Sequence, residues 1–130
     1  MKSKTDLARG WFAKATSDLA AAETLLSSHG SLDAACFHAQ QGIEKVIKAF
    51  LAYHDQEIPR THDLELLQNL CLEIQDLTEL RMLDLSQISD YAVMLRYDID
   101  FWPDRVAAEE AIRLVKIVRD ILFSATNGFT

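Results

Sequence analysis

The feature that most constrains this chain is a helical spacing of apolar residues that continues through most of its length. Only four glycines and two prolines interrupt the 130 residues, and no alternating β-branched run typical of a strand occurs. Over residues 5–28, Leu7, Trp11, Ala15 and Leu19 recur at every fourth position. This spacing places them on one face of an amphipathic helix. The chain is therefore expected to be all-α.

A second apolar stripe follows between residues 32 and 50 and predicts a helix that ends near His54. Gly30 is suited to a left-handed C-terminal cap on the first helix. Ser31 is a suitable N-cap for the second helix, and Asp33 lies in its first turn, where a carboxylate favours the helix dipole. The two helices are thus expected to be joined by a short turn.

The second half of the chain contains signals for further helices. Thr61 is the expected N-cap of a short third helix, and Asp84 with Gln87 resembles a capping box for a fourth. That fourth helix should end before Pro103, because proline disfavours helical backbone in the residue before it. Asp104 then caps the last long helix. Between residues 75 and 84 we expect a turn and one short helical piece.

These elements predict an up-and-down bundle of four main helices plus a short additional helix, because short loops favour antiparallel neighbours. The length of 130 residues fits a single domain over residues 1–130. We expect residues 127–130 to fray. No apolar run approaches the roughly 20 residues that cross a bilayer, and the N-terminus lacks a cleavable leader. No membrane association and a cytoplasmic location are expected.

Charge and cysteine content restrict the function classes. The net charge of −7 opposes broad, non-specific binding to duplex nucleic acid, so any contact with a polyanion must be local. Cys36 and Cys71 lack the paired spacing of a metal or redox motif and are interpreted as buried small hydrophobes. The four histidines are scattered, and no metal-ligand motif, phosphate loop or nucleophile elbow occurs. We therefore expect no metal and no cofactor.

A polar strip lies opposite the apolar stripe of the second helix. His38, Lys45 and Lys48 fall within one quadrant at 100° per residue. One interpretation is a solvated face, supported by the Glu44 and Lys48 pair at i,i+4. The other is a surface for phosphates or a partner subunit. Phe37 lies toward the same side, where an aromatic ring is usually covered by another chain or a loop.

The stretch from residue 96 to 105 combines two arginines with three aromatic residues. Arg96, Tyr97 and Trp102 supply the charge and stacking surfaces that splayed RNA bases and phosphates require. The alternative is that the aromatic residues close one end of the core, while three aspartates of the same stretch neutralise Arg96 and Arg105. The sequence leaves both interpretations open.

His62 lies beside the expected start of the third helix. The helix dipole disfavours a protonated imidazole there, so His62 would be able to accept or donate a proton near pH 7. A structural role, in which His62 bonds to a neighbouring loop, is the alternative.

Several segments together resemble the HEPN domain family. They are FHAQQGIEKVIKAFL (Phe37–Leu51), PRTHDL (Pro59–Leu64), LRYD (Leu95–Asp98) and AAEEAIRLVKIV (Ala107–Val118). The resemblance implies a small helical module that binds nucleotides or RNA, forms a homodimer and is often encoded beside a minimal nucleotidyltransferase. Many such domains are metal-independent ribonucleases with an Arg followed, after four to six residues, by a His.

This chain departs from the ribonuclease motif at its second member. Arg96 occupies the arginine position, but the positions for the His hold Phe101, Trp102 and Pro103. Proton transfer by such a group typically contributes roughly 10² to 10⁴ in rate. An active nuclease of this type is therefore not expected.

Three functions remain as hypotheses. The first is a non-catalytic, homodimeric module that binds a nucleotide or single-stranded RNA and pairs with a nucleotidyltransferase in a toxin–antitoxin-type pair. The second is a divergent ribonuclease toxin that uses Arg96 with His62 as a substitute base, and the third is a purely structural assembly protein. The candidate binding residues are Arg96, Tyr97, His62, Lys45 and His38, and the candidate interface residues are Phe37, Phe101 and Trp102.

Overall fold

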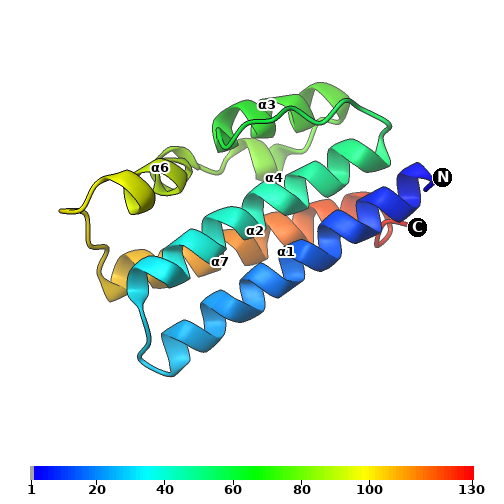
Figure 1. The fold of residues 1–130 in the computed structure, drawn as a ribbon. Helices are drawn as coiled ribbons and strands as arrows, with labels where there is room; N and C mark the ends of the chain where they lie inside the picture. Colours follow the sequence, from blue (N-terminus) through cyan, green and yellow to red (C-terminus); the bar gives the residue numbers. More distant parts are fainter. Residues whose placement is uncertain (1) are drawn as a thin grey trace.

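The computed structural model describes residues 2–130, and all regular secondary structure in that range is helical, which confirms the all-α class (Figure 1). Three helices are long and four are short. Their bounds are α1 Lys4–Ser27, α2 Leu32–Tyr53, α3 Leu64–Ile74, α4 Thr78–Arg81, α5 Ser86–Ser89, α6 Tyr91–Tyr97 and α7 Arg105–Ala125.

The three long helices form the body of the bundle. Helices α1 and α2 run antiparallel, α7 packs along both, and the chain ends lie at the same end of the molecule (Figure 1). The short helices α3, α5 and α6 pack on another side of α2. Helix α2 is therefore surrounded by the other elements.

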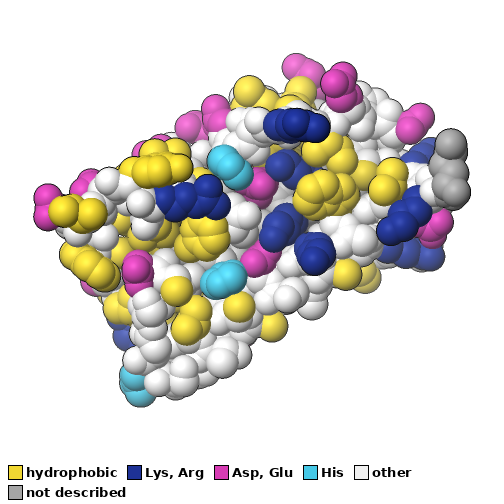
Figure 2. Space-filling model, in the orientation of Figure 1, with side chains coloured by type: hydrophobic (Ala, Val, Ile, Leu, Met, Phe, Trp, Pro, Cys, Tyr) yellow, Lys and Arg dark blue, Asp and Glu magenta, His cyan; other side chains and the backbone are white. Residues whose placement is uncertain are grey.

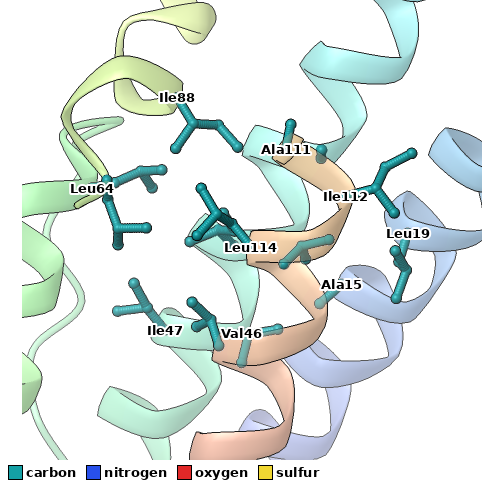
Figure 3. Close-up of a cluster of buried hydrophobic side chains, with 14 of the residues drawn as sticks. Ala15, Leu19, Val46, Ile47, Leu64, Ile88, Ala111, Ile112 and Leu114 are labelled. Carbon is teal, nitrogen blue, oxygen red and sulfur yellow. The ribbon is translucent and has the colours of Figure 1, made fainter. Parts of the chain in front are cut away.

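Burial along α2 follows from this central position. Between Ala35 and Ala52, all residues of α2 are buried except Phe37, His38, Gln41 and Lys45. Figure 3 shows part of the core, where side chains from α1, α2, α3, α5 and α7 converge. The labelled members are Ala15, Leu19, Val46, Ile47, Leu64, Ile88, Ala111, Ile112 and Leu114.

The turn after α1 differs from the sequence expectation. His29, not Gly30, has the left-handed backbone, with φ of 56°. The N–H of Gly30 donates to the Leu25 carbonyl at 2.7 Å, and the N–H of His29 donates to the Leu26 carbonyl at 3.4 Å. These two bonds form a Schellman cap. Space at Gly30 is tight, since a Cβ there would lie 3.0 Å from Leu25 Cδ2 and 3.2 Å from the Leu25 carbonyl oxygen.

Three of the four expected N-caps, those at Ser31, Thr61 and Asp84, do not form as predicted. Ser31 occupies the N-cap position of α2, but its hydroxyl donates to Asp33 instead of accepting from the backbone. Asp63, not Thr61, caps α3, because its carboxylate accepts from the N–H groups of Glu65 and Leu66.

The expected fourth helix is broken at Asp90 into α5 and α6. Asp84 accepts from both the N–H and the hydroxyl of Ser86, at 3.0 and 2.6 Å, so the predicted capping box with Gln87 is wrong. The break follows Ser89, whose hydroxyl accepts from the Leu64 N–H at 2.9 Å and so holds the end of α5 on the start of α3.

Helix α7 begins as expected, since the Asp104 carboxylate accepts from the Ala107 N–H at 2.9 Å. The expected fraying of residues 127–130 is wrong. Phe129 is fully buried, and its ring centroid lies 5.1 Å from that of Phe12. Its carbonyl accepts from Arg9 Nε at 3.2 Å. Aromatic packing therefore fixes the end of the chain on α1.

Both cysteines are free and buried, as predicted. Burial disfavours the thiolate and raises the pKa of Cys36 and that of Cys71 to about 12. In residues 2–130, no helix has both the length and the apolar character needed to cross a membrane.

Two glycines in long helices have opposite surroundings. A Cβ at Gly42 of α2 would lie 2.9 Å from Val115 Cγ2 and 3.7 Å from the Ala15 carbonyl oxygen, so this glycine permits the close approach of α7 and α1. A Cβ at Gly10 of α1 would meet nothing within 4 Å. The first glycine is required by packing, and the second is not.

We predict that Gly10→Ala raises the free energy of unfolding by about 0.5–1 kcal/mol, because alanine has less backbone freedom to lose in a helix. Gly42→Ala should lower it by about 1–3 kcal/mol through overpacking against Val115. Urea denaturation of both variants, followed by circular dichroism, measures the difference. Equal effects of the two substitutions would contradict this packing.

Candidate functional site

The polar strip of α2 is not a simple solvated face, because part of it meets Asp18 of α1. One oxygen of the Asp18 carboxylate lies 2.9 Å from His38 Nδ1, and the other accepts from Lys45 Nζ at 2.7 Å. Asp18 is itself buried. A buried carboxylate is thus held between two basic groups from α2, which is the condition for burying a charge at tolerable cost.

A second buried carboxylate, that of Glu44, has the same kind of partners. Its Oε1 lies 2.7 Å from His62 Nδ1, and its Oε2 accepts from Lys48 Nζ at 3.1 Å. The fully buried Gln40 amide donates to the carbonyl of His62 at 3.4 Å and lies 3.5 Å from Glu44 Oε1. Helix α2 is in this way attached to the segment that precedes α3.

These contacts determine which ring nitrogen of His38 and of His62 donates a hydrogen bond. An ionised carboxylate can only accept hydrogen bonds, so His38 and His62 each donate from Nδ1. Their Nε2 atoms form no hydrogen bond within residues 2–130. In the neutral state each Nε2 is an acceptor, and in the protonated state it is a donor that can contact an anion.

The carboxylates of Asp18 and Glu44 lie deeper than the side chains of His62, His38 and Lys45, whereas Lys48 is buried beside Glu44. The exposed fractions of the side chains are 50% for His62, 36% for His38 and 23% for Lys45, against 12% for Asp18 and 5% for Glu44. Figure 2 shows this face, on which histidine side chains lie beside acidic and basic side chains. A ligand that approaches this face therefore meets mainly imidazole and ammonium groups.

Arg96 extends the same surface from α6. Its guanidinium carbon lies 5.0 Å from the centroid of the Phe37 ring, and the Phe37 ring meets the His38 ring edge-on at 5.9 Å. The contact of Arg96 with Phe37 is a cation–π interaction. Phe37, which the sequence placed on the polar side, is thus partly covered by Arg96 of the same chain.

None of the aspartates in residues 96–105 forms an ion pair with Arg96 or Arg105, so this part of the second interpretation of the stretch does not hold. In residues 2–130, no carboxylate lies within salt-bridge distance of Arg96. Asp98 accepts from the N–H of Asp100, and Asp104 caps α7. Arg105 donates to the Leu26 carbonyl at 3.2 Å. The exposed guanidinium of Arg96 is therefore available to a ligand.

The aromatic residues around Arg96 have different surroundings. Phe101 packs against the core, with its ring centroid 5.7 Å from that of Tyr91. Tyr97 and Trp102 are exposed. The structure thus brings His38, Lys45, Phe37 and Arg96 together, joins His62 to the same helix through Glu44, and leaves Tyr97 and Trp102 on the outer surface.

Sequence reasoning missed Asp18 and Trp11. Asp18 lies at a helical position between Ala15 and Ala22, on the apolar stripe of the first helix, and a carboxylate there signals a buried partner. Trp11 was assigned to the core, but Lys48 Nζ lies 5.6 Å from its ring centroid. No comparable feature of the sequence indicated that Trp11, unlike its apolar neighbours, would contact a lysine.

The comparison with protein families finds a match to the HEPN domain over residues 8–124. The chain belongs to the HEPN family. No curated protein and no solved structure matches it. Membership confirms the resemblance seen in the sequence and places the chain among helical modules related to nucleotides and RNA.

In this HEPN domain, Arg96 lies in the last turn of α6, where the C-terminal end of the helix dipole favours a cation. The residues at the positions of the missing His do not replace it, since Phe101 packs into the core and Trp102 has no acid–base group. Within residues 2–130, no group of three or more metal-ligating side chains gathers.

Proposed function

We propose that this HEPN domain binds nucleotides or single-stranded RNA without cleaving it. The observation that carries the proposal is the unpaired, exposed Arg96 guanidinium over the Phe37 ring. A stacked guanidinium is held flat while its N–H groups remain free for phosphate oxygens. Its outer face can also stack on an unpaired base.

The neighbouring side chains suit the same ligand. His38 meets the Phe37 ring, and Lys45 shares the Asp18 carboxylate with His38. The combination supplies one permanent cation, one exposed imidazole and one aromatic platform beside Arg96. Such a local basic surface can bind an anion although the whole chain carries a net charge of −7.

The proposal extends to assembly and partners. Trp102, Tyr97, Ile99 and Val106 are large, exposed and apolar, and they occupy the junction of α6 and α7. We propose that a second copy covers this junction in a homodimer, because twofold association buries such a patch on both subunits at once. Family membership supports a nucleotidyltransferase as the further partner, in a toxin–antitoxin-type pair.

A ribonuclease that uses Arg96 and His62 is the second candidate. It is favoured by the contact of Glu44 with His62 Nδ1, which orients the ring and leaves Nε2 free as a base. The positions of the two residues speak against it. His62 contacts Glu44 and Gln40, whereas Arg96 contacts Phe37, and within residues 2–130 no side-chain hydrogen bond or ion pair joins the two groups.

We predict that Arg96→Ala lowers affinity for a fluorescent single-stranded RNA about tenfold or more, because a hydrogen bond to a charged group contributes roughly 1.5–3 kcal/mol. Fluorescence anisotropy at two salt concentrations measures the loss. Arg113→Ala is the control, because it removes the same charge at an exposed arginine paired with Glu110. Equal losses in both variants would remove Arg96 from the site.

We predict that the purified protein does not cleave labelled RNA faster than its His62→Ala variant. The reason is the absence of a histidine at the family position after Arg96. Gel analysis over hours, with Trp102→His as a variant that recreates the family spacing, makes the comparison. Turnover by the unmodified protein that disappears in His62→Ala would establish the ribonuclease instead.

We predict that Trp102→Glu converts a dimer into a monomer, because a carboxylate would be buried without a partner in the proposed interface. Light scattering at tens of micromolar measures the mass. Met82→Glu is the matched control, since Met82 is equally exposed but lies after α4. If the unmodified protein is a monomer, the proposed interface is refuted. If it is a stable dimer that binds no RNA, the purely structural assembly role is favoured.

A further inference from the structure

A second aromatic platform lies at the other end of the polar strip of α2 from Arg96 and Phe37. Lys48 bonds to Glu44, and its ammonium nitrogen lies 5.6 Å from the centroid of the Trp11 ring. Trp11 is only partly buried, although it packs on a small cluster around Phe129. Each end of the polar strip of α2 thus carries a cation against an aromatic ring.

The surface of α1 is hollowed beside Trp11. The hollow has a volume of about 340 Å³ and is mostly apolar in its lining. The space beside Gly10 is open, because a Cβ at this position would meet no atom within 4 Å. The hollow is lined by Lys2, Asp6, Leu7, Gly10, Trp11 and Lys14.

The charges at this hollow suit an anionic ligand with a flat apolar part. Two lysines, Lys2 and Lys14, line it together with one carboxylate, that of Asp6. Asp6 is already engaged at the start of α1, where it accepts from the Ser3 N–H. A nucleobase fits the apolar lining and Trp11, while its phosphates meet the lysines.

The distance between the two platforms sets the length of the ligand. Lys48 follows Phe37 by eleven residues on α2, which corresponds to about 16 Å at 1.5 Å per residue. That span is about five steps of a stacked strand at 3.4 Å each. His38 and Lys45 lie on α2 between the platforms. Figure 2 shows Lys and Arg side chains spread over this face, from the end of α6 toward the N-terminus.

We infer that the ligand is a single-stranded RNA of about six nucleotides, rather than a mononucleotide, with one base stacked at Arg96 and Phe37 and another at Trp11. The sugar–phosphate backbone between them passes over His38 and Lys45. This inference rests on the proposed function. It adds Trp11 and Lys14 to the binding surface and defines its length, while the buried Lys48 holds the inner side of the Trp11 ring.

The experiment uses Trp11 as its own reporter. The chain has two tryptophans, so in a Trp102→Phe background the indole fluorescence comes from Trp11 alone. Titration with a hexanucleotide should quench this fluorescence, because the base stacks on the ring, whereas a dinucleotide should bind without quenching. In the same background, Trp11→Leu should weaken hexanucleotide binding about tenfold, from a stacking contribution of roughly 1–3 kcal/mol, and leave dinucleotide binding unchanged.

A second variant covers the case in which Trp11→Leu does not fold. Lys14→Glu changes only an exposed residue and should weaken the hexanucleotide but not the dinucleotide. Lys116→Glu makes the same charge change at a lysine paired with Glu23, outside the hollow, and is the control. Equal affinity for both lengths, without quenching, would overturn the inference and leave the proposed function intact. No binding of either length would overturn both.

Discussion

The structure depends on the burial of α2 on almost every side. A helix in this position can carry polar groups only if neighbouring elements supply partners, because an unpaired buried charge costs several kcal/mol. Asp18 of α1 and Glu44 of α2 meet this condition, each with one lysine and one histidine. The same contacts tie α1 and the segment before α3 to α2. The packing of the bundle and the composition of the candidate site are therefore consequences of one constraint.

The sequence predicted the class of fold well because apolar spacing and burial are directly linked in long helices. The bounds of α1, α2 and α7 follow from that spacing. The errors lie where local alternatives compete. Thr61 and Asp63 both suit a cap, and the hydrogen-bond geometry selects Asp63. The break at Asp90 accompanies a tertiary bond, from the Leu64 N–H to Ser89, that no local pattern contains. The burial of Phe129 likewise depends on rings from distant segments.

For the candidate site, the sequence identified side chains but not their connections. Residues on one helix, such as His38 and Lys45, were placed correctly on one side because helical geometry relates them. The contact of Arg96 with Phe37 joins residues nearly sixty positions apart, and the pairing of Asp18 with His38 joins two helices. The sequence left the role of the aspartates after Arg96 open because proximity in sequence does not decide whether an ion pair forms. The Asp98 carboxylate instead accepts a hydrogen bond within the turn after α6, and the Asp104 carboxylate caps α7.

The arrangement of charges also resolves an apparent conflict between an acidic chain and the proposed anionic ligand. Long-range repulsion from a net charge of −7 is screened within about 10 Å at ordinary salt, so binding depends on the groups at the surface of contact. On this face the carboxylates of Asp18 and Glu44 lie inside and the imidazoles of His38 and His62 lie outside. The buried acids also orient the imidazoles, because each accepts a hydrogen bond from the Nδ1–H of one ring. Removing an acid to make the face more basic would therefore also release the imidazole that this acid holds in place.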